Sequence, residues 1–77
     1  MIFKIIKTMR IKANLTQSEL ANKCNIANTT LSGYETGYRE PNFEMLNIIA
    51  NQCGFEIRFV NKKNDVLTLQ NITRKEL

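Results

Sequence analysis

The chain has 77 residues, a length that allows one domain whose core buries about 60% of the surface exposed by the unfolded chain. Eleven Lys and Arg against 7 Asp and Glu give a formal charge of +4, which suits a polyanionic partner but is also common on solvated surfaces. The chain has no histidine and no paired cysteines at zinc-ligand spacing, so we expect neither a metal site nor a cofactor.

The amino-terminal segment, MIFKIIKTMRIKA, has apolar side chains interrupted by lysine and arginine. Ile2, Ile5, Ile6 and Met9 fall on one side at the helical period, which predicts an amphipathic helix rather than a signal peptide or a membrane span. We expect Asn14 to end this helix, because asparagine tolerates the left-handed backbone conformation common at helix ends.

The next segment carries a strong helix-start signal. Thr16 and Glu19 have the spacing of a capping box, in which each side chain bonds the backbone amide of the other residue. A second helix is therefore expected from Gln17 to about Lys23 or Cys24.

A third helix is predicted to begin near Ala27 or Asn28 and to stop at Gly37, with Leu31 and Tyr34 facing inward. Only about three residues separate it from the second helix. The two helices must therefore cross steeply, which is the helix-turn-helix arrangement.

A fourth helix is expected after Pro41, capped by Asn42 and ended by Gly54. Its apolar face comprises Phe43, Leu46, Ile49 and Ala50. The pattern then changes to a period of two in FEIRFV (55–60), which the polar turn NKKN separates from a second run, DVLTLQNI (65–72). This change predicts a β-hairpin.

Cys24 and Cys53 fall at positions where the helical pattern places apolar residues. We interpret both as small buried core residues, with a disulfide or redox-active thiol as the alternative. A reducing cytoplasm is the expected compartment, in a bacterial or phage protein that associates with the nucleoid when bound to DNA.

The spacing of several residues resembles that of the lambda-repressor-like, or xenobiotic-response-element (XRE)-type, helix-turn-helix family. The similar positions span residues 5–54 and are Arg10, Gln17, Leu20, Ala21, Ile26, Leu31, Glu35, Gly37, Pro41, Leu46, Ile49, Ala50 and Gly54. The resemblance implies a mainly α, compact four-helix DNA-binding domain whose third helix enters the major groove of double-stranded DNA. It also implies an ion pair between Arg10 and Glu35.

Expected DNA contacts follow from this arrangement. The outward side of the third helix offers Asn28, Thr29, Ser32 and Gly33, of which Asn pairs with adenine and Thr with several base edges or a thymine methyl group. Gly33 costs about 1 kcal/mol relative to Ala in a helix, but lets the backbone or a methyl group approach closely. The expected phosphate contacts lie at the start of the second helix and in the loop after the third: Gln17, Thr36, Tyr38 and Arg39.

Three sequence features depart from the family pattern, and Gly33 within the third helix is one of them. Ala27 stands where a Ser or Thr cap is usual, and Asn25 replaces the usual turn glycine, an exchange that Asn tolerates because it adopts positive φ.

We expect residues 1–54 to form the DNA-binding domain, 55–72 a hairpin for dimerisation and 73–77 a flexible tail. An isolated hairpin is marginally stable in water, so its apolar side chains need a cover. A second copy of the chain would cover them, and packing of the hairpin onto its own helices is the alternative. The candidate interface residues are Phe55, Ile57, Phe59, Val66, Leu67 and Leu69.

These features favour a transcriptional regulator, a homodimeric repressor that binds a palindromic operator. One alternative is an antitoxin that autoregulates its operon and binds a cognate toxin. Another is a protein-interaction adaptor without DNA binding, suggested by Gly33 and the modest charge. No nucleophile-base pair and no phosphate-binding glycine loop points to an enzyme.

Overall fold

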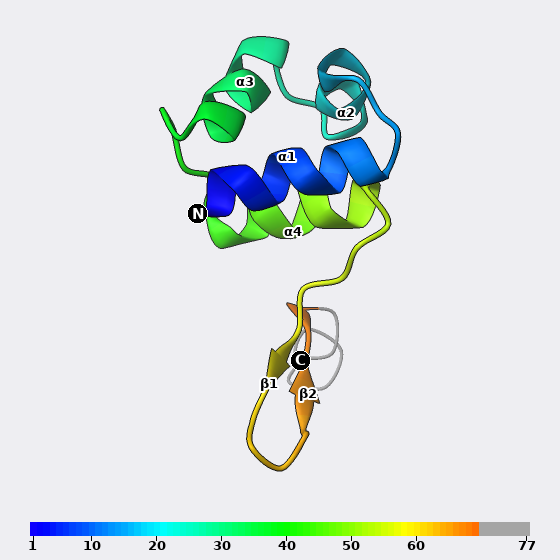
Figure 1. Cartoon of the computed structure of the whole chain (residues 1–77), viewed down its shortest axis with the longest axis vertical. Coiled ribbons are helices and arrows are strands. Elements are labelled where there is room, and N and C mark those ends of the chain that lie inside the picture. The colour runs from blue at the N-terminus through cyan, green and yellow to red at the C-terminus, as the bar shows by residue number, and fades with distance from the viewer. Residues whose placement is uncertain (70–77) are drawn as a thin grey trace.

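The computed structural model describes residues 1–69, so residues 70–72 of the predicted hairpin and the predicted tail at 73–77 lie outside the described part. The element order is α1 (Ile2–Lys12), α2 (Gln17–Lys23), α3 (Asn28–Thr36), α4 (Phe43–Gln52), β1 (Phe59–Val60) and β2 (Val66–Leu67) (Figure 1). The mainly helical fold with a small carboxy-terminal strand pair is thereby confirmed.

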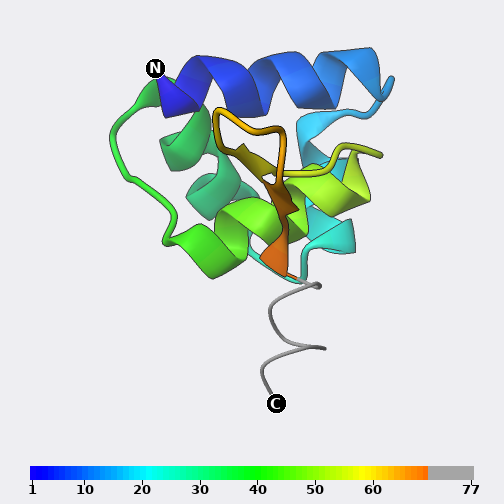
Figure 2. The same ribbon diagram turned by 90° about the horizontal axis from the view of Figure 1, so that it is seen from below.

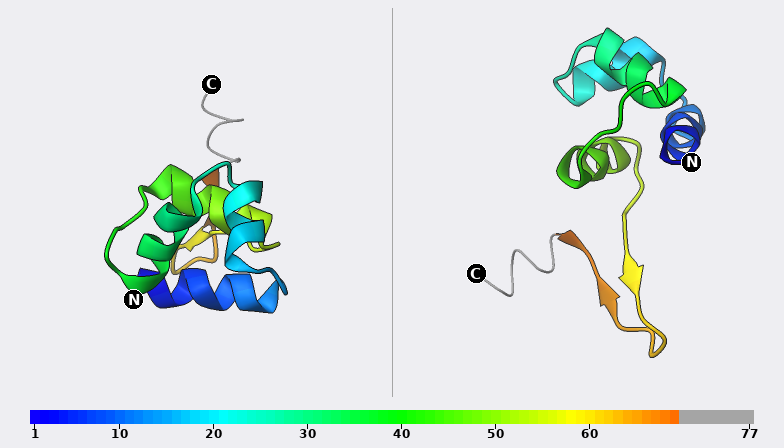
Figure 3. Two further views of the ribbon diagram at one scale, coloured as in Figure 1. Left: turned by 90° about the horizontal axis from the view of Figure 1, so that it is seen from above. Right: turned by 90° about the vertical axis from the view of Figure 1, so that its left-hand side faces the viewer.

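The helices form two layers. α1 and α4 lie side by side in the middle of the molecule, with α2 and α3 on one side of them and the strand pair beyond α4 on the other (Figures 1 and 3). The largest wholly buried side chains come from all four helices and are Ile6, Leu20, Leu31 and Ile49. No helix within residues 1–69 has the length and apolar character needed to cross a membrane.

Side-chain caps set where α2 and α4 begin. The Thr16 amide donates to Oε1 of Glu19 at 2.8 Å, and the Glu19 amide donates to Oγ1 of Thr16 at 3.1 Å. The hydrogen bond from the Thr16 amide is the main cause that lowers the pKa of the Glu19 carboxyl, because it favours the charged form. The Met45 amide donates to Oδ1 of Asn42 at 2.8 Å, so both caps occur at the positions expected from the sequence.

Asparagines end α1 and form the turn between α2 and α3. Asn14 has a φ of 60° and Asn25 a φ of 58°, the left-handed conformation that asparagine tolerates better than most residues. Ala27 is the amino-terminal flanking residue of α3 and makes no side-chain cap hydrogen bond. The steep connection between α2 and α3 therefore depends on backbone conformation and packing, not on a cap.

The apolar face of α1 is narrower than predicted. Ile6 and Met9 are buried, but Ile2 is 38% exposed and Ile5 is 52% exposed. The expectation that all four would share the buried face was wrong, because α1 contacts the rest of the core mainly along the stripe of Ile6 and Met9. Phe43, predicted on the apolar face of α4, is likewise 40% exposed.

Both cysteines are buried free thiols, as expected for core residues. Cys24 packs in the core cluster with Leu20 and Ala21, and Cys53 joins it from the end of α4. Burial raises the pKa of each thiol, which disfavours the reactive thiolate.

The hairpin is shorter than the period-two pattern predicted. Phe59 pairs with Leu67 and Val60 with Val66 in antiparallel register, whereas residues 55–58 lie outside the strands. Oδ1 of Asn61 accepts the backbone amides of Lys63 and Asp65 at 2.8 and 3.0 Å, which holds the turn together. Figure 2, which views the molecule from below, shows the strand pair in front of the helices, because it extends away from them beyond α4 (Figure 1).

Gly37 and Gly54 provide a matched test of a left-handed helix end, with φ values of 83° and 81°. An added Cβ at Gly37 would stand 3.1 Å from Cδ1 of Phe3, whereas at Gly54 it would meet nothing within 4 Å. Gly54→Ala should cost about 1–2 kcal/mol from the backbone alone, and Gly37→Ala should cost more because Phe3 must also move. Urea unfolding of both variants tests this difference, and equal losses would contradict the role of Phe3.

Candidate nucleic-acid interface

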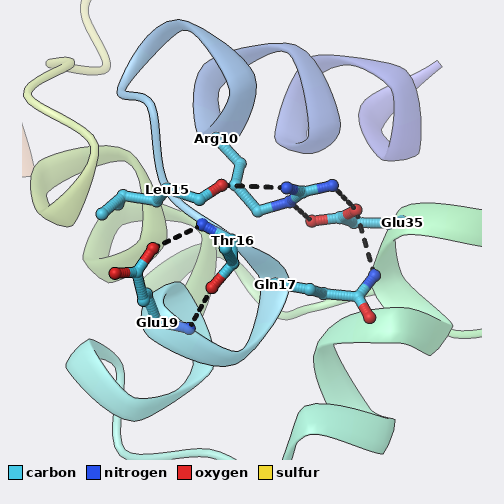
Figure 4. Close-up of polar contacts among 6 residues, drawn as sticks. All are labelled: Arg10, Leu15, Thr16, Gln17, Glu19 and Glu35. Carbon is cyan, nitrogen blue, oxygen red and sulfur yellow. Dashed lines mark hydrogen bonds and ion pairs between the residues drawn. The ribbon is translucent and has the colours of Figure 1, made fainter.

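A buried ion pair ties α3 to the rest of the helix-turn-helix unit. Nε and Nη2 of Arg10 donate to Oε2 and Oε1 of Glu35 at 2.7 and 3.0 Å (Figure 4). The two side chains are 14% and 3% exposed. Nη1 of Arg10 donates to the carbonyl oxygen of Leu15 at 3.0 Å, and Nε2 of Gln17 donates to Oε1 of Glu35 at 3.2 Å.

This network connects three parts of the chain through one carboxylate. Arg10 comes from α1, Gln17 from the first turn of α2 and Glu35 from the last turn of α3. The hydrogen bond to Glu35 is the main cause that raises the pKa of Arg10, so the guanidinium stays charged. The network fixes the orientation of α3 relative to α1 and α2.

Gln17, which the sequence predicts to contact a phosphate, uses part of its side chain for a hydrogen bond within the protein. One N–H group of its amide donates to Glu35, and a primary amide has two such groups. Gln17 is half-buried, and its second N–H group has no hydrogen-bond partner among residues 1–69.

The four predicted base-contact residues differ in exposure. Asn28 and Thr29 are exposed at the start of α3, and Ser32 is half-buried one turn later. Gly33 is buried, and an added Cβ there would stand 3.3 Å from Cδ of Arg39. The Arg39 side chain therefore lies against α3 at Gly33, and the close approach of a base or a methyl group at this residue stays a prediction.

The loop between α3 and α4 exposes the other predicted phosphate contacts. Tyr38 is 86% exposed, and Thr36 and Arg39 are also exposed. Oγ1 of Thr36 donates to the carbonyl oxygen of Gly33 at 3.2 Å, so this hydroxyl retains only its acceptor capacity. The Arg39 amide donates to the same carbonyl at 3.1 Å, which holds the loop against α3.

Thr30 belongs to this surface but was not among the predicted site residues. It lines a hollow of about 260 Å³ together with Thr29, Tyr38 and Arg39. Its place three residues before Gly33 on the same helix side was a usable signal in the sequence. The approach of Arg39 to that side had no signal in the sequence, because it depends on the path of the loop.

The predicted dimerisation residues divide into two groups. Ile57 is half-buried and packs against the helical core, and Leu69 is also half-buried. The ring of Phe59 lies 5.7 Å from that of Phe43, measured between centroids, so the hairpin partly packs onto its own helices. The side chains that stay more than one-third exposed are Phe55, Phe59, Val66 and Leu67.

Comparison with known proteins agrees with this geometry. The helix-turn-helix family profile matches residues 6–60, which is most of the chain. The chain belongs to the XRE-type helix-turn-helix family. This family member is 38% identical over 63 residues to the HTH-type transcriptional regulator ImmR of Bacillus subtilis (strain 168), a match that covers 82% of the chain and 50% of ImmR.

The helix-turn-helix chain thus spans about half the length of the curated relative that it matches. A comparison with solved structures gave no significant match.

Proposed function

We propose that this helix-turn-helix protein is a sequence-specific DNA-binding transcriptional regulator that inserts α3 into the major groove. The observation that carries the proposal is the exposed polar start of α3, at Asn28 and Thr29, on a helix held by the buried Arg10–Glu35 pair. The family assignment supports it, as does the similarity to ImmR, whose name describes a transcriptional regulator. Figure 1 shows the strand pair at the far end of the molecule from α2 and α3, so the described chain leaves α3 uncovered.

The exposed residues have distinct proposed roles. Asn28 and Thr29 contact base edges, with Ser32 at the margin, since amide and hydroxyl groups match the donors and acceptors of adenine and thymine. Gln17, Thr36 and Tyr38 contact phosphates and set the position of α3 on the duplex.

We also propose that the protein acts as a homodimeric repressor on a palindromic operator. Two recognition helices must stand about 34 Å apart to enter successive major grooves on one side of a duplex. Because the strand pair lies opposite α3, copies joined only at the hairpin tips would direct their α3 helices away from each other (Figure 1). The hairpins must therefore meet side by side, with Phe59, Val66 and Leu67 between the copies.

A second candidate function is an antitoxin that binds a protein partner through the hairpin. The observation in its favour is the exposure of Phe59, Val60 and Leu67, each more than half exposed, at a distance from α3. Such a surface leaves α3 free for an operator while a toxin is bound. Co-purification with the product of the neighbouring reading frame, lost in Phe59→Asp, would favour this function over a regulator acting alone.

Selection of bound duplexes from a random pool tests the proposed function. We expect a palindrome whose half-sites are one helical turn apart, and binding that weakens steeply with salt. Asn28→Ala should relax one position in each half-site by about 1–3 kcal/mol, because one bidentate base contact is lost. The matched control Asn51→Ala, an exposed asparagine on α4, should leave the preference unchanged.

Two results would contradict the proposal. Flat salt dependence and no selected sequence would indicate a protein-interaction adaptor. If a single half-site is selected instead, the protein still recognises a DNA sequence, but it does not bind as a dimer to a palindrome.

A further inference from the structure

The stem of Arg39 lies across α3 at Gly33. A Cβ placed on Gly33 would stand 3.3, 3.4 and 3.6 Å from Cδ, Cγ and Cβ of Arg39, so three successive carbons of the arginine follow the helix surface. The Arg39 amide also donates to the Gly33 carbonyl at 3.1 Å. The missing side chain of Gly33 therefore makes room for the arginine against the helix.

This position places Arg39 on the outward side of α3. Gly33 follows Thr29 by four residues and Thr30 by three, and residues with these spacings share one side of a helix. Arg39, Thr29, Thr30 and Tyr38 line one hollow of about 260 Å³. The Arg39 side chain therefore adjoins the exposed residues at the start of α3.

α3 itself supplies no free charged side chain to this surface. Its single charged residue, Glu35, is buried and paired with Arg10. The guanidinium of Arg39 makes no hydrogen bond or ion pair with any residue of the described range 1–69. Its N–H groups are therefore available for a ligand.

We propose that Arg39 contacts the base edge of a guanine in the major groove, beside the bases contacted by Asn28 and Thr29. The planar guanidinium fits the O6 and N7 acceptors of guanine, a pattern that the small amide and hydroxyl groups of α3 do not complement. A side chain that extended from the loop toward solvent would contact a phosphate, whereas one laid along α3 enters the groove with the helix. Gly33 is thus a positioning residue for Arg39.

This assignment rests on the proposed function, and a comparison of substitutions tests it separately. Arg39→Ala should remove the preference for guanine at one position per half-site, by about ten- to a hundredfold, and should change the other positions little. Arg39→Lys keeps the charge but lacks the planar guanidinium, so it should also lose most of that preference. Arg58→Ala is the matched control, because Arg58 is exposed in the chain segment leading into the hairpin, far from α3.

Gly33→Ala changes the position of the Arg39 side chain without changing its charge. The added methyl group would crowd Cδ and Cγ of Arg39 and shift the guanidinium, while alanine suits the helix better than glycine. We expect weaker guanine preference at the same position in a protein that melts at the same or a higher temperature.

The outcomes distinguish this proposal from the one on which it rests. If Arg39→Ala weakens all sequences equally and lowers the salt slope by about one, while Arg39→Lys binds like the wild type, Arg39 is a phosphate contact and the assignment is overturned. If the wild-type protein itself selects no sequence, the proposed function fails, independently of Arg39.

Discussion

Glu35→Ala should lower the free energy of unfolding by about 3–5 kcal/mol. The substitution leaves the Arg10 guanidinium with a side chain only 14% exposed and without its carboxylate partner, and it also removes the acceptor for Gln17. Domains of this size have a total stability of about 4–12 kcal/mol, so the loss is a large share of the whole. Urea unfolding followed by circular dichroism measures it.

Two control variants separate the burial of this pair from its charge. Arg58→Ala removes an ion pair with Glu56 whose side chains are 61% and 49% exposed, and it should cost less than 1 kcal/mol. Replacing both buried partners, as Arg10→Met with Glu35→Leu, should cost less than Glu35→Ala alone, because no charge is then left buried. A double variant that loses as much as the two single variants combined would contradict this explanation.

Leu31→Ala should lower the free energy of unfolding by about 2–5 kcal/mol. Leu31 is wholly buried and is the largest core side chain that α3 contributes. Removing it costs the transfer free energy of the lost carbon atoms and leaves a cavity between α3 and the other helices. Thermal and urea unfolding measure the change.

Ile11→Ala is the matched control, since it also shortens a branched aliphatic side chain, but one that is 58% exposed. Little apolar surface returns to water in this variant, and alanine is the better helix former, so the cost should stay below about 1 kcal/mol. Similar losses in Leu31→Ala and Ile11→Ala would mean that α3 is not anchored through the core.

Local signals in the sequence predicted the helices well, because each signal acts within a few residues. The capping box at Thr16 and the asparagine cap at Asn42 have hydrogen-bond partners three residues away. The left-handed positions at Asn14 and Gly37 depend on the conformational preference of a single residue. Such features need no knowledge of how the helices pack.

Predictions that depended on packing were less accurate. Periodicity placed Ile5 with Ile6 and Met9, but the width of the buried stripe depends on which helices lie against α1. Alternation predicted a strand from Phe55, but Ile57 instead packs against the helical core and the strand pairing begins at Phe59. Whether such a residue joins a strand or packs on a helix depends on which element buries it. The pattern of apolar residues along the chain does not contain that information.

By itself the sequence determined the helix ends, the helix-turn-helix connection and the residue types offered at the start of α3, since these depend on local backbone and side-chain chemistry. The tertiary structure alone decided that Gln17 donates to Glu35 and that Arg39 covers Gly33. Gln17 and Glu35 are 18 residues apart in the chain, and the loop path sets the direction of Arg39. Contacts of this kind arise only when the packed helices fix where separate segments meet.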